Sequence, residues 1–340
     1  MRGRPPTIQD VAKRAGVGVS TVSKVLNGYR DVADDTRRRV LRAVEELSYR
    51  PSRTARTFRT GKTRTISVFT PMIGTEFYDR LITSIDAELA AHDYDAALFP
   101  LLSEQRLERY RSPEALPYHA DGLILASLNP DWLFADGLLP VVLPAVLVDA
   151  YHAAYDTVTI DNAGGADTAT THLLDVDAPT FAIMIERFAD GPFSSGVFIE
   201  RHKGFVRAME RRGRAVEEGT VLSARFSDTG GREALRRILT RTEPPINVFA
   251  SCDLVAKGVL DEAHDVGLAV GHDLRLVGFD DQPWAARAGL STVHQPIERM
   301  GSLATELLFR RLDHPQDPPV HHELVPELVV RSSSEGGGAS

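Results

Sequence analysis

Residues Thr7–Asn27 read TIQDVAKRAGVGVSTVSKVLN and predict two short helices joined by a glycine turn. The first half repeats apolar side chains at helical spacing, and Thr7 followed by Asp10 resembles a capping box. Gly16 lets the chain turn. In the second half one face is apolar, whereas the other carries small polar side chains and Lys24. A small, cationic outer face is typical of a helix that enters the major groove of DNA, which is about 12 Å wide.

Charge is divided unevenly along the chain at Arg64. Residues 1–64 contain 16 Lys and Arg against 6 Asp and Glu, a net of +10, so the rest of the chain carries −18 of the overall −8. This asymmetry predicts that the basic part contacts a polyanion while the acidic body has another task. A solvated basic tail is the alternative, but the segment is periodic and apolar enough to fold.

Composition excludes several classes of protein. The single cysteine, Cys252, rules out an internal disulfide and cannot build a thiolate metal site alone. The N-terminus MRGRPP has no apolar segment behind it and is not a secretion signal. The most apolar run, Leu138–Val148, has 11 residues with two prolines, fewer than the roughly 20 of a spanning helix. We therefore predict a cytoplasmic protein without a membrane segment, metal site or cofactor.

A third helix and a basic segment follow the first two helices. Residues Asp34–Leu47 have the apolar spacing of a helix that closes a three-helix core, and the tyrosine, arginine and proline at 49–51 end it. Residues 51–62, PSRTARTFRTGK, are either a linker or a helix formed on contact. Phe58 lies among arginines that recur every three residues. It is either a wedge in the minor groove or a packing residue on a neighbouring domain.

From Thr65 onward, short β-rich apolar runs alternate with helical ones, which predicts parallel sheets covered by helices. The predicted strands include 66–70, 96–99, 123–126, 141–148, 158–161, 181–185, 248–250 and 274–279, and the predicted helices include 78–91, 163–174, 199–212, 232–240 and 254–266. The number of runs favours two doubly wound subdomains over one sheet. We predict an N-terminal all-α helix-turn-helix headpiece and an α/β effector domain of two doubly wound parallel-sheet subdomains. The boundaries are 1–50 for the DNA-binding domain, 51–62 for the hinge, 63–332 for the effector-binding and dimerisation domain, and 333–340 for a disordered tail. The N-subdomain takes about 63–159 and 293–316, and the C-subdomain about 160–292 and 317–332.

Four segments resemble one known family, the lactose-repressor (LacI/GalR) family of bacterial regulators. TIQDVAKRAGVGVSTVSKVLNG is similar to its headpiece and TRRRVLRAVEELSYRPSRTAR to its third helix and hinge, while VFASCDLVAKGVL and LRLVGFDDQPWA resemble signatures of its effector domain. The resemblance implies a periplasmic-binding-protein-like body that closes around a small molecule. It also implies a homodimer or tetramer, with dimer contacts around residues 77–94, whose headpieces read a pseudo-palindromic operator in double-stranded DNA.

Carried over by position, the resemblance places side chains of the second helix at base edges and hinge side chains in the minor groove. Lys24 then donates to guanine, Ser20 serves several bases and Val19 contacts a thymine methyl group. Gly18 stands where the family often has serine, and Phe58 where it usually has an intercalating leucine. The predicted DNA-binding residues are Thr7, Val19, Ser20, Thr21, Ser23, Lys24, Asn27, Tyr49, Arg53, Ala55, Arg56 and Phe58.

The same resemblance gives a set of residues for the effector cleft. Carboxylates that accept from hydroxyl groups, a forked arginine and aromatic rings favour a neutral sugar over a strongly anionic ligand. The set is Phe77, Asp149, Asp161, Arg201, Asp253, Asp280 and Trp284. Two alternatives stay open. An aspartate that follows a strand, as Asp161 and Asp280 do, is often a helix cap, and Trp284 is as well suited to core packing as to pocket lining.

The functional prediction is a repressor whose operator affinity depends on the bound effector, with the direction of the effect left open. The alternative is a sugar-binding or sugar-modifying enzyme with an attached helix-turn-helix. The sequence has no GxxxxGK[ST] loop, no HExxH spacing and no GxSxG elbow, so we predict no catalytic residues. Near the C-terminus, Glu298–Leu312 is predicted as a helix of the N-subdomain, and residues 320–331 as strands that return to the other subdomain.

Overall fold

The computed structural model describes residues 4, 6–26, 28–29, 31–49, 61–101, 105–106, 120–134, 137–139, 143–185 and 196–335. The chain divides into two compact units, Met1–Arg64 and Thr65–Ser340, which we call the head and the body. Within the described ranges, no helix is long and apolar enough to cross a membrane. The hinge predicted at 51–62 falls almost wholly outside the described residues.

The head is a three-helix unit, as its sequence predicted. Its helices enclose a small apolar core that contains Val11, Val22 and Val40, none of which is exposed. Gly16 ends the first helix in the left-handed conformation, at φ 65°, which a side chain rarely adopts. The predicted interaction at the helix start is also present, because the Asp10 carboxylate accepts from the Thr7 backbone N–H at 2.8 Å. The helices are α1 (Ile8–Ala15), α2 (Val19–Leu26) and α3 (Asp34–Glu46).

One half of the body, which we call the N-subdomain, is built on a parallel six-stranded sheet in the order β11-β5-β4-β3-β1-β2. Helices α5 (Glu76–Ala91) and α13 (Ile297–Asp313) pack together on one face, and the short helix α7 (Pro130–Leu133) lies in the apolar cluster on the other. The strands are β1 (Thr65–Thr70), β2 (Asp95–Pro100), β3 (Gly122–Ala126), β4 (Ala145–Val148), β5 (Asp156–Ile160) and β11 (His321–Leu324).

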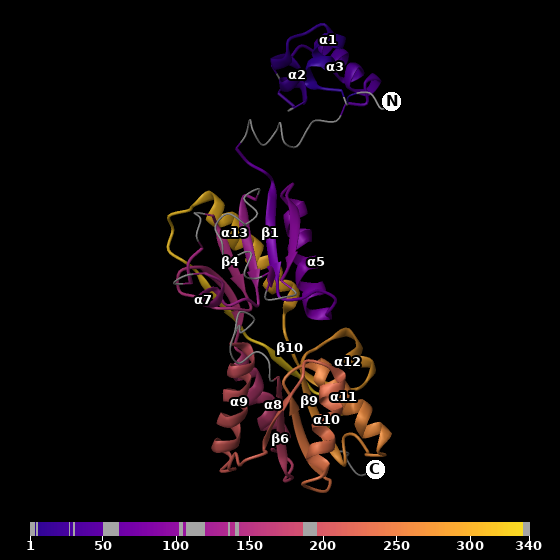
Figure 1. Ribbon diagram of the computed structural model, residues 1–340, viewed down its shortest axis with the longest axis vertical. Coiled ribbons are helices and arrows are strands. Elements are labelled where there is room, and N and C mark those ends of the chain that lie inside the picture. The colour runs from indigo at the N-terminus through magenta and orange to yellow at the C-terminus, as the bar shows by residue number, and fades with distance from the viewer. Residues whose placement is uncertain are drawn as a thin grey trace. The chain divides into compact units, whose positions relative to one another are not determined.

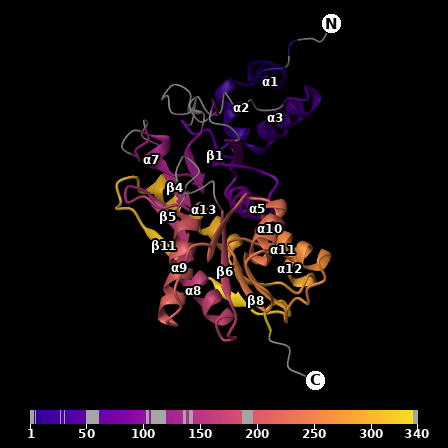
Figure 2. The same cartoon turned by 60° about the horizontal axis from the view of Figure 1, so that its bottom comes forward.

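The second half of the body, the C-subdomain, has another six-stranded sheet in the order β12-β10-β9-β8-β6-β7, with only β12 antiparallel among these strands. Successive strand residues alternate between two apolar clusters, one shared with α8 and α9 and the other with α10 and α11. The two pairs of helices lie on either side of this sheet (Figures 1 and 2). The helices are α8 (Asn162–Leu173), α9 (Val197–Arg211), α10 (Asp228–Leu239), α11 (Asp253–Asp265) and α12 (Pro283–Arg287). The strands are β6 (Thr180–Ile185), β7 (Val221–Ala224), β8 (Ile246–Ala250), β9 (Leu274–Asp280), β10 (Ser291–His294) and β12 (Glu327–Val329).

The chain passes from one subdomain to the other at Asp161, at Gln295–Pro296 and at Val325–Pro326. The doubly wound fold of the body and the placement of the Glu298–Leu312 helix in the N-subdomain are therefore confirmed.

Two expectations about the C-terminal region were wrong. Residues 320–331 do not all return to the C-subdomain, because β11 pairs in parallel with β5 of the N-subdomain. The unexposed Asp156 carboxylate explains this position: it accepts from the Val320 N–H at 2.7 Å and from the Arg311 guanidinium at 2.8 Å, which fixes the chain entering β11 beside β5. Only β12 crosses over.

The second correction concerns the start of the predicted disordered tail. Ser333 and Ser334 are buried, and the Ser333 hydroxyl donates to the Leu276 carbonyl oxygen at 2.7 Å. The Ser334 carbonyl oxygen accepts from the Arg275 guanidinium at 2.6 Å. Residues 333–335 are thus part of the folded C-subdomain, while 336–340 fall outside the described residues.

Candidate ligand cavity and DNA-reading face

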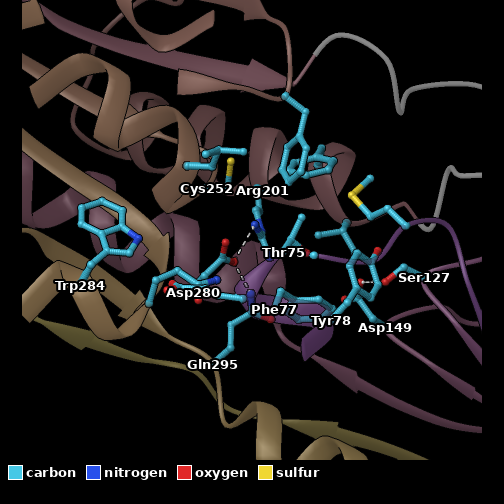
Figure 3. A pocket seen from close by; sticks show the side chains of 18 residues that line it. Thr75, Phe77, Tyr78, Ser127, Asp149, Arg201, Cys252, Asp280, Trp284 and Gln295 are labelled. Atoms are coloured by element: carbon cyan, nitrogen blue, oxygen red, sulfur yellow. Dashed lines mark hydrogen bonds and ion pairs between the residues drawn. The ribbon is translucent and has the colours of Figure 1, made fainter. Parts of the chain in front are cut away.

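A cavity of about 310 Å³ lies between the two subdomains of the body, beyond the carboxyl ends of their strands. This is where ligands bind in open α/β sheets. Ser127, Asp149, Asp280 and Gln295 each stand at or directly after the end of a strand (Figure 3). The lining is mostly apolar, with Met72, Phe77, Tyr78, Val197, Phe198, Phe226, Leu254 and Trp284, together with Gly74, Thr75, Glu76, Ser127, Asp149, Arg201, Cys252, Asp280, Gln282 and Gln295.

One end of the cavity is formed by Ser127 and Asp149, which follow the neighbouring strands β3 and β4. Both have positive φ, 50° and 57°, although neither is a glycine. Such backbone strain persists only where surrounding structure enforces it, and it gathers at functional sites. The Ser127 hydroxyl donates to the Asp149 carboxylate at 2.6 Å. Burial raises the pKa of Asp149 to about 6.

Asp280 and Arg201 form a second charged group in the cavity. Arg201, 3% exposed, packs over the Phe279 ring at 3.6 Å from the centroid and lies 3.6 Å from the Asp280 carboxylate. Its Nε donates to the Asn162 side-chain oxygen at 2.8 Å and its Nη1 to the Ser251 carbonyl oxygen at 2.6 Å. Burial raises the pKa of Asp280 to about 6, against the opposing effect of Arg201. Arg201, the one arginine among the described residues of the lining, is thus held by the protein at two of its three nitrogens.

Three buried polar atoms of the cavity lining have no hydrogen-bond partner among the described residues: Thr75 Oγ1, Gln282 Oε1 and Gln295 Oε1. The two amide oxygens can only accept a hydrogen bond. Leaving a buried acceptor unpaired costs about 1–3 kcal/mol, which a donor group of a bound molecule recovers. Acceptors that await donors thus dominate the polar part of the cavity.

The structure brings together five of the seven predicted effector residues: Phe77, Asp149, Arg201, Asp280 and Trp284 all line the cavity. Trp284 lies at the opposite end of the cavity from Ser127 and Asp149 (Figure 3).

Asp161 and Asp253 do not line the cavity. The Asp161 carboxylate accepts from the Gly164 N–H at 2.6 Å, which makes it the N-cap of α8, the alternative that the sequence left open. Asp253 is wholly buried behind the lining. Its carboxylate accepts from the Thr292 hydroxyl at 2.6 Å and from the Gln282 N–H at 2.8 Å, so it supports the turn that carries Asp280.

Sequence reasoning missed several lining residues. Ser127 directly follows a strand that the sequence identified, so the rule on strand ends was sufficient to find it. Gln295 follows β10, a short strand that was not predicted, and Gln282 and Cys252 carry no pattern of their own. The apolar members Met72, Val197, Phe198, Phe226 and Leu254 are indistinguishable from core residues in sequence.

On the head, the predicted reading face of α2 is open to solvent. Val19 is 43% exposed, and Ser20 and Lys24 are exposed beside it, while Thr21 and Ser23 are half-buried. The Lys24 ammonium pairs with the Asp31 carboxylate at 2.6 Å. This surface offers the donors and the small apolar contact that base edges require.

Other predicted DNA-binding residues have different places. The Thr7 hydroxyl donates to Asp10 at 2.7 Å within the start of α1. Tyr49, at 8% exposed, packs in the apolar core of the head, because the turn after α3 folds it back over the helices. The remaining predicted residues, Asn27, Arg53, Ala55, Arg56 and Phe58, lie outside the described residues.

Comparisons with known proteins agree with this architecture. Residues 7–52 match the family model of bacterial regulatory proteins of the lacI family, and residues 170–334 match the model of a periplasmic binding protein-like domain. The ribose operon repressor of Halalkalibacterium halodurans is 31% identical over 335 residues, which cover 97% of this chain and 98% of that protein.

Among solved structures, a probable transcription regulator from Thermus thermophilus is 42% identical with a TM-score of 0.70 and covers 81% of this chain and 100% of its own. A complex of the transcriptional regulator CelR with cellobiose is 29% identical with a TM-score of 0.72, over 96% of this chain and 99% of that one. With a three-helix head, a two-subdomain body and a relative at 31% identity along nearly its whole length, the chain belongs to the lacI family of bacterial regulatory proteins.

Proposed function

We propose that this regulator is a transcriptional repressor that binds operator DNA through α2 and whose operator affinity is set by a neutral sugar in the cavity of the body. The observation that supports this choice of ligand is that the cavity offers hydrogen-bond acceptors, which a ligand with hydrogen-bond donors would satisfy. Asp149 and the oxygens of Gln282 and Gln295, which have no partner among the described residues, accept hydrogen bonds, whereas two of the three Arg201 nitrogens already donate to protein oxygens. A polyol supplies many hydroxyl donors at once.

The apolar part of the lining supports the same ligand class. Phe77, Phe198, Phe226 and Trp284 present ring faces or edges that suit the C–H surface of a sugar ring. The volume of about 310 Å³ is at the lower end of the range typical of small-molecule sites, which fits a mono- or disaccharide. Two relatives support the proposal through their names, a ribose operon repressor and a regulator complexed with cellobiose.

A strongly anionic effector is disfavoured by charge. Among the described residues, Asp149, Asp280 and Glu76 line the cavity against the single guanidinium of Arg201. Placing another anion among buried carboxylates costs Coulomb energy that a medium of low dielectric constant screens poorly.

An enzyme with an attached helix-turn-helix is the weaker candidate. The part of the cavity lining that the structure describes contains no histidine, and the Ser127 hydroxyl donates to a carboxylate rather than lying beside a nitrogen base. Burial and nearby carboxylates raise the pKa of the Cys252 thiol, which disfavours the nucleophilic thiolate.

The DNA side of the proposal rests on the head. A net of +10 over residues 1–64 supplies attraction to phosphate, and the exposed face of α2 supplies base contacts. We propose a cytoplasmic homodimer in which each head binds one half-site of a pseudo-palindromic operator. In this arrangement the predicted hinge residues Arg53, Ala55, Arg56 and Phe58, which follow the third helix, contact the minor groove.

Regulation follows from linkage between the two sites. A sugar that binds one arrangement of the subdomains more tightly shifts the population toward it by the difference in binding free energy, and operator DNA reciprocally changes sugar affinity. We test this with a thermal-shift screen of D-ribose, D-glucose, D-galactose and cellobiose, followed by operator titrations with and without the best sugar. Stabilisation by a sugar together with a changed operator affinity supports the proposal. A sugar that binds without changing operator affinity refutes the coupling, and no stabilisation by any of the sugars refutes the ligand class.

A further inference from the structure

Gln295 occupies a distinct position among the residues of the cavity. It stands between β10 of the C-subdomain and α13 of the N-subdomain, where the chain crosses from one to the other. Its side chain is 1% exposed and points into the cavity toward Asp280 (Figure 3). A group bound to this side chain therefore acts directly on a connection between the subdomains.

The two ends of the Gln295 amide have different roles. The Nε2 group donates to Asp280 Oδ1 at 2.5 Å, which ties the crossover to the end of β9. Oε1 is buried and has no partner in the part of the chain that the structure describes. When a hydroxyl group of a bound molecule donates to Oε1, the hydroxyl, the Gln295 amide and the Asp280 carboxylate form one hydrogen-bonded chain.

The turn that carries Asp280 is in turn bound to the N-subdomain. Asp280 and Asp281 both have positive φ, 122° and 51°, so this turn is strained. The Asp281 carboxylate accepts from Arg331 at 2.8 Å and contacts the His294 ring at 3.0 Å. Its carbonyl oxygen accepts from Arg80 of α5 at 3.3 Å.

Arg80 links the Asp280–Asp281 turn to α13 as well as to α5. Its guanidinium pairs with Glu298 in the first turn of α13 at 2.7 Å, so α5 and α13 are joined at the point where α13 leaves Gln295. If a bound molecule moves the Asp280–Asp281 turn, the movement is thus transmitted to both α5 and α13 of the N-subdomain through a few covalent and hydrogen bonds.

Gln282 provides a matched comparison within the same cavity. It is also buried, at 7% exposed, lines the cavity and has an unpaired Oε1. Its side chain also hydrogen-bonds Asp280. Gln282 is the N-cap of α12 inside the C-subdomain, however, and no crossover passes through it. The two glutamines share chemistry and burial and differ in position.

We propose that Gln295 is the positioning residue through which occupancy of the cavity sets the angle between the two subdomains, with a ligand hydroxyl donating to its Oε1. The inference rests on the proposed function, because it requires a ligand rich in hydroxyl donors. Gln282 contributes to holding the ligand but not to setting the angle.

The experiment measures the distance between the subdomains by spin labels on Glu210→Cys of α9 and Asp313→Cys of α13, both exposed positions. The only native cysteine, Cys252, is 1% exposed and stays unlabelled. Labelled chains are mixed with an excess of unlabelled ones so that each assembly carries one pair. Gln295→Leu and Gln282→Leu are compared in this background, unliganded and with saturating D-ribose, D-glucose or cellobiose, and thermal melting checks that each variant is folded.

We expect a sugar to shift the distance in the parent. In Gln295→Leu the unliganded distance distribution broadens and the sugar-induced shift is lost. In Gln282→Leu the sugar binds about tenfold more weakly, as loss of a buried hydrogen bond predicts, yet at saturation it produces the parental shift. Should Gln295→Leu fail to fold, Gln295→Asn, which retracts the amide by one methylene group, replaces it with the same expectation.

A parental distribution and a parental shift in Gln295→Leu overturn the inference, as does an equal loss of the shift in both variants. If no sugar moves the parent, the ligand proposal fails separately. The unliganded comparison then still decides the role of Gln295. Both variants lose a side-chain hydrogen bond to Asp280, so broadening in Gln295→Leu but not in Gln282→Leu depends on the place of Gln295 at the crossover.

Discussion

We predict that the substitution Asp149→Asn raises the free energy of unfolding at neutral pH and lowers the affinity for the sugar. The Asp149 carboxyl is 8% exposed, and burial raises its pKa from 3.8 to about 6, with the Ser127 hydrogen bond and Arg201 acting in the opposite direction. In the unfolded chain the same carboxyl ionises near its ordinary pKa. Between these two values the folded protein binds more protons than the unfolded one, so its stability falls as the pH rises from about 4 to about 6.

The magnitude follows from the same shift. A pKa raised from 3.8 to about 6 corresponds to about 3 kcal/mol of unfolding free energy lost at neutral pH. Asparagine does not titrate and its side-chain oxygen still accepts from the Ser127 hydroxyl. We therefore expect Asp149→Asn to be more stable than the parent at pH 7.5 by up to about 3 kcal/mol and nearly equal to it at pH 4. Sugar affinity should fall, because a charged acceptor is replaced by a neutral one.

Differential scanning calorimetry across pH 4–8 gives the stability difference, and titration calorimetry with the best sugar gives the affinity. The exposed Asp86 of α5 supplies a matched control, Asp86→Asn, which makes the same chemical change outside the cavity. A stability difference for Asp149→Asn that is independent of pH would refute the reasoning, since it would mean that burial does not disfavour the ionised carboxylate.

Three further predictions concern other parts of the chain. Lys24→Ala should relax the preference at one base pair per half-site at a cost of ~1–3 kcal/mol, measured on DNA selected from a random pool; equal losses on selected and random DNA would contradict a base contact. Asp161→Ala should lower the free energy of unfolding by about 0.5–2 kcal/mol through loss of the α8 cap, while sugar affinity stays unchanged in titration calorimetry; a lost affinity would return Asp161 to the site. Gly204→Ala should destabilise the body by about 1–3 kcal/mol in denaturant unfolding, because its Cβ would lie 2.1 Å from the Ala163 carbonyl oxygen, and an unchanged midpoint would show that α8 and α9 separate freely.

Much of the fold was predictable because it depends on local periodicity. Helix α5 and strand β1 are long, regular apolar patterns, and the structure places both within two residues of the predicted bounds. Strands β7 and β10, of four residues each, were missed, because so short a run does not establish a period. The partner of β11 was also unpredictable, since the burial of Asp156 against Arg311 depends on residues about 155 positions apart.

The candidate site shows the same division. Asp161 and Asp280 occupy equivalent positions in sequence, each at the end of an apolar strand, yet one caps a helix and the other lines the cavity. The difference is local backbone geometry: Gly164 offers its N–H to Asp161 at 2.6 Å, whereas the positive φ of Asp280 turns its carboxylate toward Arg201 and Gln295.

By itself the sequence determined the parts whose physics is local: a basic three-helix head with a small polar face on α2, an acidic body of alternating strands and helices, and polar residues at strand ends. The tertiary structure decided which of those polar residues meet. Ser127 and Gln295 belong to the cavity only because the ends of β3 and β10, which are in different sheets, face the same space. That juxtaposition depends on packing between segments far apart in the chain, and periodicity within one segment carries no information about it.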